Sequence, residues 1–99
     1  MKIEVVCLRL IEPKESGLVA FSDVRIECVT IRDFRVFKRN GGKPFVQVPY
    51  NTIKKDGRIQ FHPIIDLPEE IRAAVDAAIL NAYFRKRDGE NDRSSGQTF

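Results

Sequence analysis

Residue types that catalytic and metal sites depend on are scarce in this sequence. It has one histidine, two cysteines and no tryptophan among 99 residues. Cys7 and Cys28 are 21 positions apart, a spacing that matches no zinc site. The sequence also lacks a glycine-rich phosphate loop and a serine on a nucleophile elbow. We therefore predict that the protein is not an enzyme, holds no metal or cofactor and has no small-molecule substrate.

The few reactive residues that are present have structural explanations. His62 has no carboxylate that the sequence fixes beside it, so we expect it to bond a strand end. Glu69 and Glu70 fall in the first turn of a predicted helix, where the helix dipole favours acidic side chains. Cys7 and Cys28 fall in predicted strands, which favours two buried free thiols in a reducing cytosol. A disulfide between them requires that their strands be neighbours.

Long apolar runs are absent as well. No stretch approaches the ~20 apolar residues that a membrane-spanning helix needs. Charges interrupt the apolar N-terminus, so we expect a cytoplasmic protein with no signal peptide and no membrane partner. The composition, 42% hydrophobic and 31% charged, is typical of a globular protein. We predict one domain over residues 1–87 and, because residues 88–99 show no periodicity, a disordered tail after it.

The first two thirds of the chain predict an antiparallel sheet of about five strands joined by short turns. Val6, Leu8 and Leu10 alternate on one face of the first strand. In the third strand the apolar phase changes near Arg32-Asp33, which indicates either a bulge or two partly covered faces. Residues 50–56 are predicted to form a polar loop that an Asp-Gly turn closes. The predicted strands are residues 3–12, 18–26, 28–37, 44–48 and 58–61.

One long helix is predicted to follow the sheet, which makes the fold class α+β. Asp66 is a good N-cap, and Glu69 three residues later completes a capping box. The helix should run to about Lys86 and end before Gly89.

The predicted helix carries two apolar stripes. The first suits packing against the sheet and consists of Ile71, Ala74, Val75, Ala78, Ile79 and Ala82. The second lies on roughly the opposite side and consists of Ala73, Ala77, Leu80 and Phe84. We interpret the second stripe as a homodimer interface. The alternative is that Leu80 and Phe84 fold under a sheet edge or are simply exposed.

Basic residues are unevenly distributed along the chain. The net charge is +3, but residues 1–37 sum to zero, residues 38–60 to +5 and residues 61–99 to −2. Clustered lysine and arginine suit a phosphate backbone, although a solvated loop surface is the plainer explanation. Our first choice for phosphate contact is Lys54, Lys55 and Arg58, and our second is Lys38, Arg39 and Lys43.

Two further groups bear on nucleic-acid binding. Arg85, Lys86 and Arg87 near the helix end either extend the basic patch or complement the helix dipole. Phe45, Tyr50 and Phe61 lie near the basic loops, where they either stack on unpaired bases or belong to the core and its rim.

The order of these features resembles the SpoVG family, the stage V sporulation protein G or septation-regulator family. In its members an xVHDIRVI-type strand leads into a glycine-containing hairpin and an FVAMPS-type strand. A basic loop with a DG turn, an HPI segment and a helix ending near AVLxEY follow. The matching residues are Ile31-Arg32-Asp33-Phe34-Arg35-Val36, Asn40-Gly41-Gly42, Phe45-Val46-Gln47-Val48-Pro49, Asp56-Gly57, His62-Pro63-Ile64 and Ala78-Ile79-Leu80-Asn81-Ala82-Tyr83.

The resemblance covers about residues 3–84 and departs from the family pattern in one loop. Tyr50 stands where the family has serine, and Asn51 and Thr52 stand where it usually has a basic pair. Lys54 and Lys55 follow instead, with a one-residue change of spacing before the Asp-Gly turn.

The resemblance implies a dimeric SpoVG-like fold and a function without catalysis. Members are bacterial cytoplasmic homodimers that bind DNA, and in some cases RNA, in gene regulation linked to septation and sporulation. The residues alone leave a second class open, a protein-interaction adaptor that docks through the second helix stripe. Only nucleic-acid binding predicts a steep dependence of affinity on salt.

Overall fold

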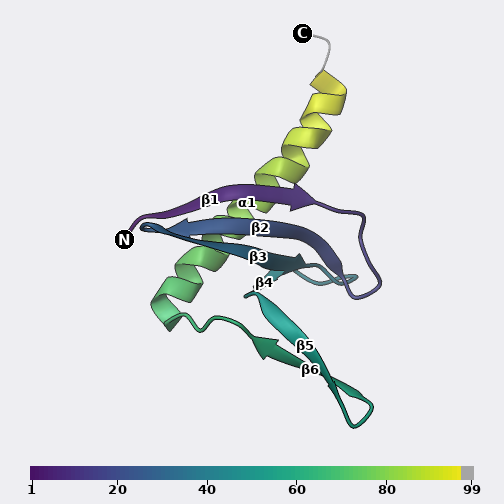
Figure 1. Ribbon diagram of the computed structural model, residues 1–99. Helices are drawn as coiled ribbons and strands as arrows, with labels where there is room; N and C mark the ends of the chain where they lie inside the picture. The colour runs from purple at the N-terminus through teal and green to yellow at the C-terminus, as the bar shows by residue number, and fades with distance from the viewer. Residues whose placement is uncertain (97–99) are drawn as a thin grey trace.

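The computed structural model describes the backbone of residues 1–96 and the side chains of residues 1–89. Four antiparallel strands form the main sheet in the order β1-β2-β3-β4, β5 and β6 form a separate two-stranded hairpin, and one helix lies against the main sheet (Figure 1). The predicted α+β class is confirmed, although the predicted single sheet is divided in two. The elements are β1 (Ile3–Leu10), β2 (Leu18–Ile26), β3 (Val29–Phe37), β4 (Phe45–Gln47), β5 (Tyr50–Lys55), β6 (Arg58–Pro63) and α1 (Glu69–Gly96).

The register of the main sheet shifts at three places along β2, once in its pairing with β1 and twice in its pairing with β3. Between β2 and β3 the register shifts opposite Asp23, where β3 inserts Arg32 and Asp33, so the predicted bulge is confirmed. Asp33 takes a positive φ of 68° there, a conformation that aspartate tolerates better than most residues. The β1–β2 register shifts between Val5 and Cys7. The extra residue, Val6, is 45% exposed, so its predicted place beside Leu8 is wrong.

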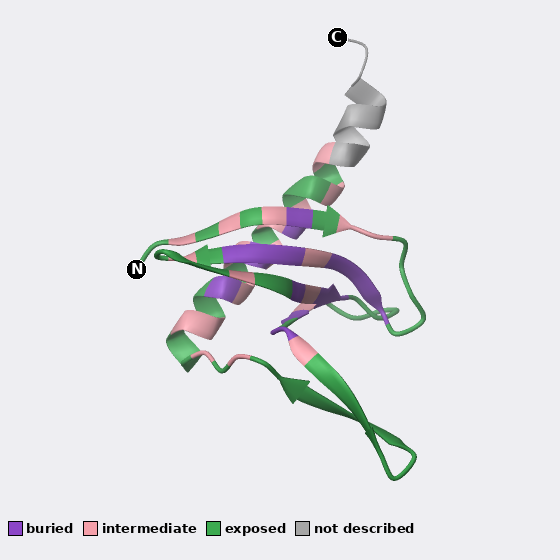
Figure 2. Cartoon of the chain, in the orientation of Figure 1, coloured by how far each residue is buried: buried purple, intermediate pink, exposed green. Residues whose placement is uncertain are grey.

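The core lies between the main sheet and α1. Residues of β1 to β4 on one sheet face, such as Leu8 and Phe34, pack against the buried helix residues Val75, Ile79 and Tyr83. Burial is strongest along β2, as Figure 2 shows. The remaining members of the buried cluster are Val19, Ala20, Val24, Val36, Val46 and Val48.

The helix differs from its prediction at both ends. It begins at Glu69, with its first hydrogen bond from the Arg72 N–H to the Pro68 carbonyl, because a residue that precedes proline is pushed out of helical geometry. It continues to Gly96, so the predicted end near Lys86 is wrong, whereas the predicted disorder of the tail stays a prediction. A single glycine such as Gly89 costs a helix only about 1 kcal/mol and does not stop it. Residues 97–99 of the predicted tail lie outside the described residues.

The segment predicted as a polar loop is the strand β5. Its residues pair in register with β6 from Tyr50 opposite Pro63 to Lys55 opposite Arg58. The two-residue turn between the strands, Asp56-Gly57, has φ values of 53° and 75°, as a tight hairpin turn requires. The hairpin projects away from the main sheet and is exposed along most of its length (Figure 2). Its base is closed by the Ile64 N–H, which donates to the Pro49 carbonyl at 2.9 Å.

The cysteines are both free, as predicted, but only one of them lies in a strand. Cys7 is half-buried in β1, whereas Cys28 is exposed in the turn between β2 and β3. The predicted burial of Cys28 is therefore wrong, because Glu27, at a φ of 55°, and Cys28 form the turn. In the described part of the chain, no helix has the length and apolar character that crossing a membrane demands.

Candidate nucleic-acid interface

The helix covers only one face of the main sheet, and the opposite face, here called the open face, carries arginine and aromatic side chains. Strand alternation places every second residue of β1 to β4 on this face. One row across the four strands is in register and runs Arg9, Phe21, Arg35 and Gln47. A second row, of Leu18, Phe37 and Phe45, lies beside it. The open face is therefore both cationic and aromatic.

Arginine guanidinium groups lie over the aromatic rings of this face. Arg9 and Arg35 lie 5.9 and 5.7 Å from the ring centre of Phe21. Arg35 also lies 4.2 Å from the ring centre of Tyr50, the first residue of the hairpin. Cation–π attraction at these distances holds the guanidinium groups in place while their charge stays near the surface. Tyr50, a predicted site residue, is thus tied to the sheet.

The carboxylate of Asp23 in β2 is buried and accepts hydrogen bonds from groups of β1 and β3. Asp23 is 5% exposed and lies opposite the β3 bulge. It accepts hydrogen bonds from the Asp33 N–H at 3.1 Å, from Arg32 at 3.3 Å and from Arg9 at 3.4 Å. A hydrogen bond to the Cys7 sulfur and, more weakly, the charge of Asp23 raise the pKa of Arg9 against the opposing effect of desolvation. These arginines are therefore committed to structural ion pairs.

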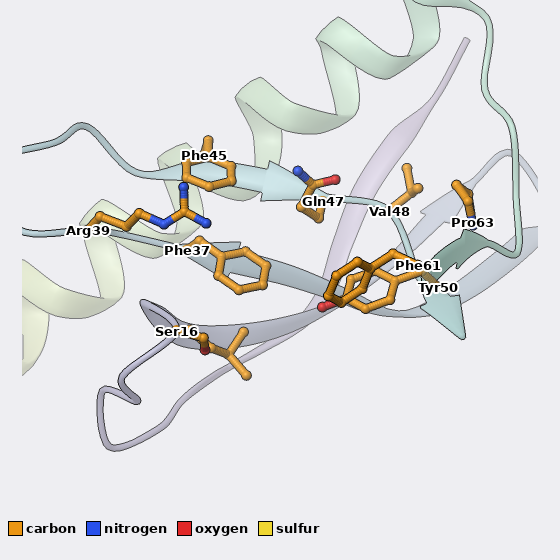
Figure 3. A pocket seen from close by; sticks show the side chains of 10 residues that line it. Ser16, Phe37, Arg39, Phe45, Gln47, Val48, Tyr50, Phe61 and Pro63 are labelled. Carbon is orange, nitrogen blue, oxygen red and sulfur yellow. The ribbon is translucent and has the colours of Figure 1, made fainter. Parts of the chain in front are cut away.

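Between the open face and the hairpin lies a cavity of about 380 Å³, here called the aromatic hollow. At one end Phe37 and Phe45 stack at 5.6 Å, and at the other Tyr50 and Phe61 meet edge to face at 5.2 Å (Figure 3). Arg39 reaches over Phe45, 5.5 Å from the ring centre. The other lining residues are Ser16, Leu18, Gln47, Val48 and Pro63. An apolar hollow of this size with a few polar groups at its rim is the usual form of a site for a small organic group.

The turn between β3 and β4, residues 38–44, is here called the basic turn, and Gly17 positions it. The Lys38 N–H donates to the Gly17 carbonyl at 2.7 Å. Gly17 has a φ of +95°, and a Cβ there would lie 3.1 Å from Arg39 Cγ and 3.3 Å from the Lys38 carbonyl oxygen. Only glycine permits this approach of two backbones, so the loop before β2 fixes where the basic turn leaves the sheet. Lys38, Arg39 and Lys43 are all exposed on it.

The second predicted cluster lies at the hairpin tip, residues 54–58. Lys54, Lys55 and Arg58 are all exposed there. Strand alternation separates them, because Lys54 shares the hairpin face of Tyr50 and Phe61 whereas Lys55 and Arg58 lie on the other face. The aromatic hollow lies between this hairpin and the basic turn, since both contribute to its lining.

The cations of the basic turn and the hairpin tip differ from most arginines elsewhere in their pairing. Arg9, Arg25, Arg32, Arg72 and Arg87 each form an ion pair with a carboxylate. Within the described side chains, none of the six loop cations does so. Arg35 is free of carboxylates in the same sense, and donates only to the Asp33 carbonyl at 3.4 Å. The basic turn, the hairpin tip and Arg35 together therefore carry seven cations that have no carboxylate partner among the described side chains.

The other predicted site residues are not brought together with these loops. Arg85 and Lys86 line a shallow hollow beside β1, at the opposite edge of the sheet from β4, so they do not extend the patch. On the predicted dimer stripe, Ala73 and Ala77 are exposed, whereas Leu80 and Phe84 are half-buried and pack partly against the chain's own core. The alternative to a dimer interface, in which Leu80 and Phe84 pack within their own chain, therefore accounts for part of the second apolar stripe.

Sequence reasoning missed Arg35, Phe37 and Gln47 as candidate site residues. The signal was present in β3, where Phe34 and Val36 occupy one parity and Arg35 and Phe37 the other. Nothing in the sequence indicated Asp23, because only the pairing of β2 with β3 places it opposite the predicted bulge.

Comparison with known proteins leaves the family open: no protein-family model matches this chain, and no curated protein sequence matches it. The SpoVG resemblance therefore stays a prediction. Among the described residues, no three histidine, cysteine or acidic side chains are grouped as a metal ion requires. His62, which we expected at a strand end, is exposed on β6 with its Nε2 3.3 Å from Gln60 Oε1.

Proposed function

We propose that this protein binds nucleic acid through the basic turn and the hairpin tip. The observation that carries the proposal is a set of six loop cations that have no carboxylate partner among the described side chains. Three lie on the basic turn, which lines the aromatic hollow through Arg39, and three lie at the tip of the hairpin, whose base lines the same hollow. Unpaired lysine and arginine can exchange small counterions for phosphates, and the release of those counterions supplies most of the affinity. Arg39 belongs to both features, because it lines the hollow and lies on the basic turn.

The resemblance to the SpoVG family supports a regulatory role for this binding. On that basis the protein is a bacterial cytoplasmic homodimer that binds DNA or RNA in gene regulation linked to septation and sporulation. The altered segment after Pro49 forms β5, so Lys54 and Lys55 lie at the far end of a strand, near the turn. We therefore expect phosphate contact at the hairpin tip and not at the hairpin base.

Salt dependence tests the proposal. A dimer that makes roughly five phosphate contacts on duplex DNA should show a log–log slope of affinity against salt of about −4 to −5, and should lose on the order of several hundred-fold between 50 and 200 mM. The double variant Lys54→Ala/Lys55→Ala should bind all sequences more weakly and flatten the slope of the dimer by about two units or more. The measurement is fluorescence anisotropy of a labelled duplex over a range of salt concentrations.

A charge-matched control removes two cations near the other end of the sheet. Lys2→Ala/Arg25→Ala changes the net charge equally, next to the turn between β2 and β3. We expect this variant to keep the wild-type slope. Binding that is insensitive to salt in the wild-type protein, or equal losses in both double variants, would contradict the proposal. The first of these results would favour the adaptor that docks through α1.

A further inference from the structure

The aromatic hollow distinguishes this surface from one that binds phosphates alone. Phosphate contact needs only exposed cations, but here four aromatic rings converge between the open face and the hairpin. Phe61 remains 64% exposed although it forms part of the hollow. Exposed apolar surface that gathers in a hollow with a polar rim is typical of an interaction site.

We propose that the aromatic hollow takes unpaired bases, so that the preferred ligand is a single-stranded nucleic acid rather than a duplex. This inference rests on the proposed function and names its substrate class. Bases in a duplex are stacked and paired inside the helix, whereas the bases of a single strand can turn outward and stack on aromatic rings. A cavity of about 380 Å³ admits a planar base but not the side of a duplex.

The arrangement of charge around the hollow supports the same ligand. Arg35 lies over Tyr50 and Arg39 over Phe45, so a guanidinium group adjoins the rings at each end. A strand that places its bases in the hollow has its phosphates within the reach of these groups, and beyond them lie the basic turn and the hairpin tip. Base stacking tolerates any sequence because every base has a flat face, so the hollow by itself does not select a sequence.

Two substitutions on one face of the hairpin isolate the stacking contribution. Phe61 and Ile59 share a face of β6 and are equally exposed at 64%, but only Phe61 lines the hollow. We expect Phe61→Thr to lower the affinity for oligothymidine about 5- to 100-fold. Ile59→Thr should change it less than about twofold, because threonine suits a strand and no base contact is removed. The salt slope should stay the same in both variants, since stacking releases no counterions.

The experiment is anisotropy of labelled oligothymidine and of a duplex of equal phosphate number, with thymidine monophosphate as a competitor. Tighter binding of the single strand, with a loss confined to Phe61→Thr, supports the inference. Equal affinity for the two ligands with no effect of Phe61→Thr, equal losses in both variants, or displacement by micromolar mononucleotide would each overturn it. If neither ligand binds even at low salt, the proposed function fails as well.

Discussion

At the scale of single residues, Asp23 is the buried carboxylate around which the open face is arranged. Its carboxylate joins three strands, because it accepts from the Asp33 N–H of β3, from Arg32 of the same strand and from Arg9 of β1. The bulge therefore has a specific partner for its extra backbone N–H. The same contacts hold Arg9 and Arg32 in ion pairs, which leaves Arg35 as the arginine of this face that is free to meet a ligand.

Asp23→Ala should lower the free energy of unfolding by about 1–3 kcal/mol, because the substitution leaves the Asp33 N–H and the Arg32 guanidinium group without their acceptor and Arg9 with Asp33 as its one carboxylate partner. Urea denaturation checks this. Glu4→Ala is the matched control, since it breaks the Glu4–Arg25 pair, whose side chains are about half exposed. An exposed pair of this kind contributes less than about 1 kcal/mol. Equal losses in the two variants would show that Asp23 is an ordinary surface acid.

At the scale of elements, the sequence predicted the main sheet better than the hairpin. The ranges of β2 and β3 and the bulge near Arg32-Asp33 follow from alternation, which buried strands express strongly. β5 was predicted as a loop because neither of its faces is packed, so its sequence shows no apolar alternation. Its strand conformation comes from pairing with β6 across a tight turn, a non-local contact that a single segment does not reveal.

The candidate site was predictable in part for the same reason. Exposed lysines and arginines in turns are visible in the sequence, and the two predicted clusters lie on the turn and on the hairpin that both contribute to the lining of the hollow. The hollow itself was not predictable, because it forms where β3, β4 and the hairpin meet. Tyr83 was missed on the helix because it belongs to neither predicted stripe, although it is buried against the core.

The predicted homodimer has its interface on the second apolar stripe of α1. Ala73→Glu/Ala77→Glu should convert a dimer into a monomer at micromolar concentration, because both positions are exposed on α1 and two charges would be buried in the interface. Light scattering measures the mass, and circular dichroism should show an unchanged fold, since glutamate is a good helix former. A monomeric wild-type protein would refute the dimer. A dimer that persists in this variant but dissociates in Ile53→Thr/Ile59→Thr would place the interface on the hairpin, where both residues are exposed.

At the scale of the whole molecule, the two faces of the main sheet have different roles. The face under α1 forms the core, and the opposite face, with the hairpin, presents unpaired cations and aromatic rings. The helix and the candidate interface lie on different sides of the sheet, so a ligand can occupy the open face without displacing any core contact. This division is the central claim of the account.

Backbone amide chemical shifts test that claim most directly. Titration of the labelled protein with a single strand of about 12 nucleotides, within the range that one small domain covers, should shift the amides of the basic turn, of the hairpin and of Arg35 on the open face. The exposed helix positions Ala73 and Ala77 should stay unshifted. Shifts that cluster on α1 and leave the basic turn and hairpin unchanged would contradict the account.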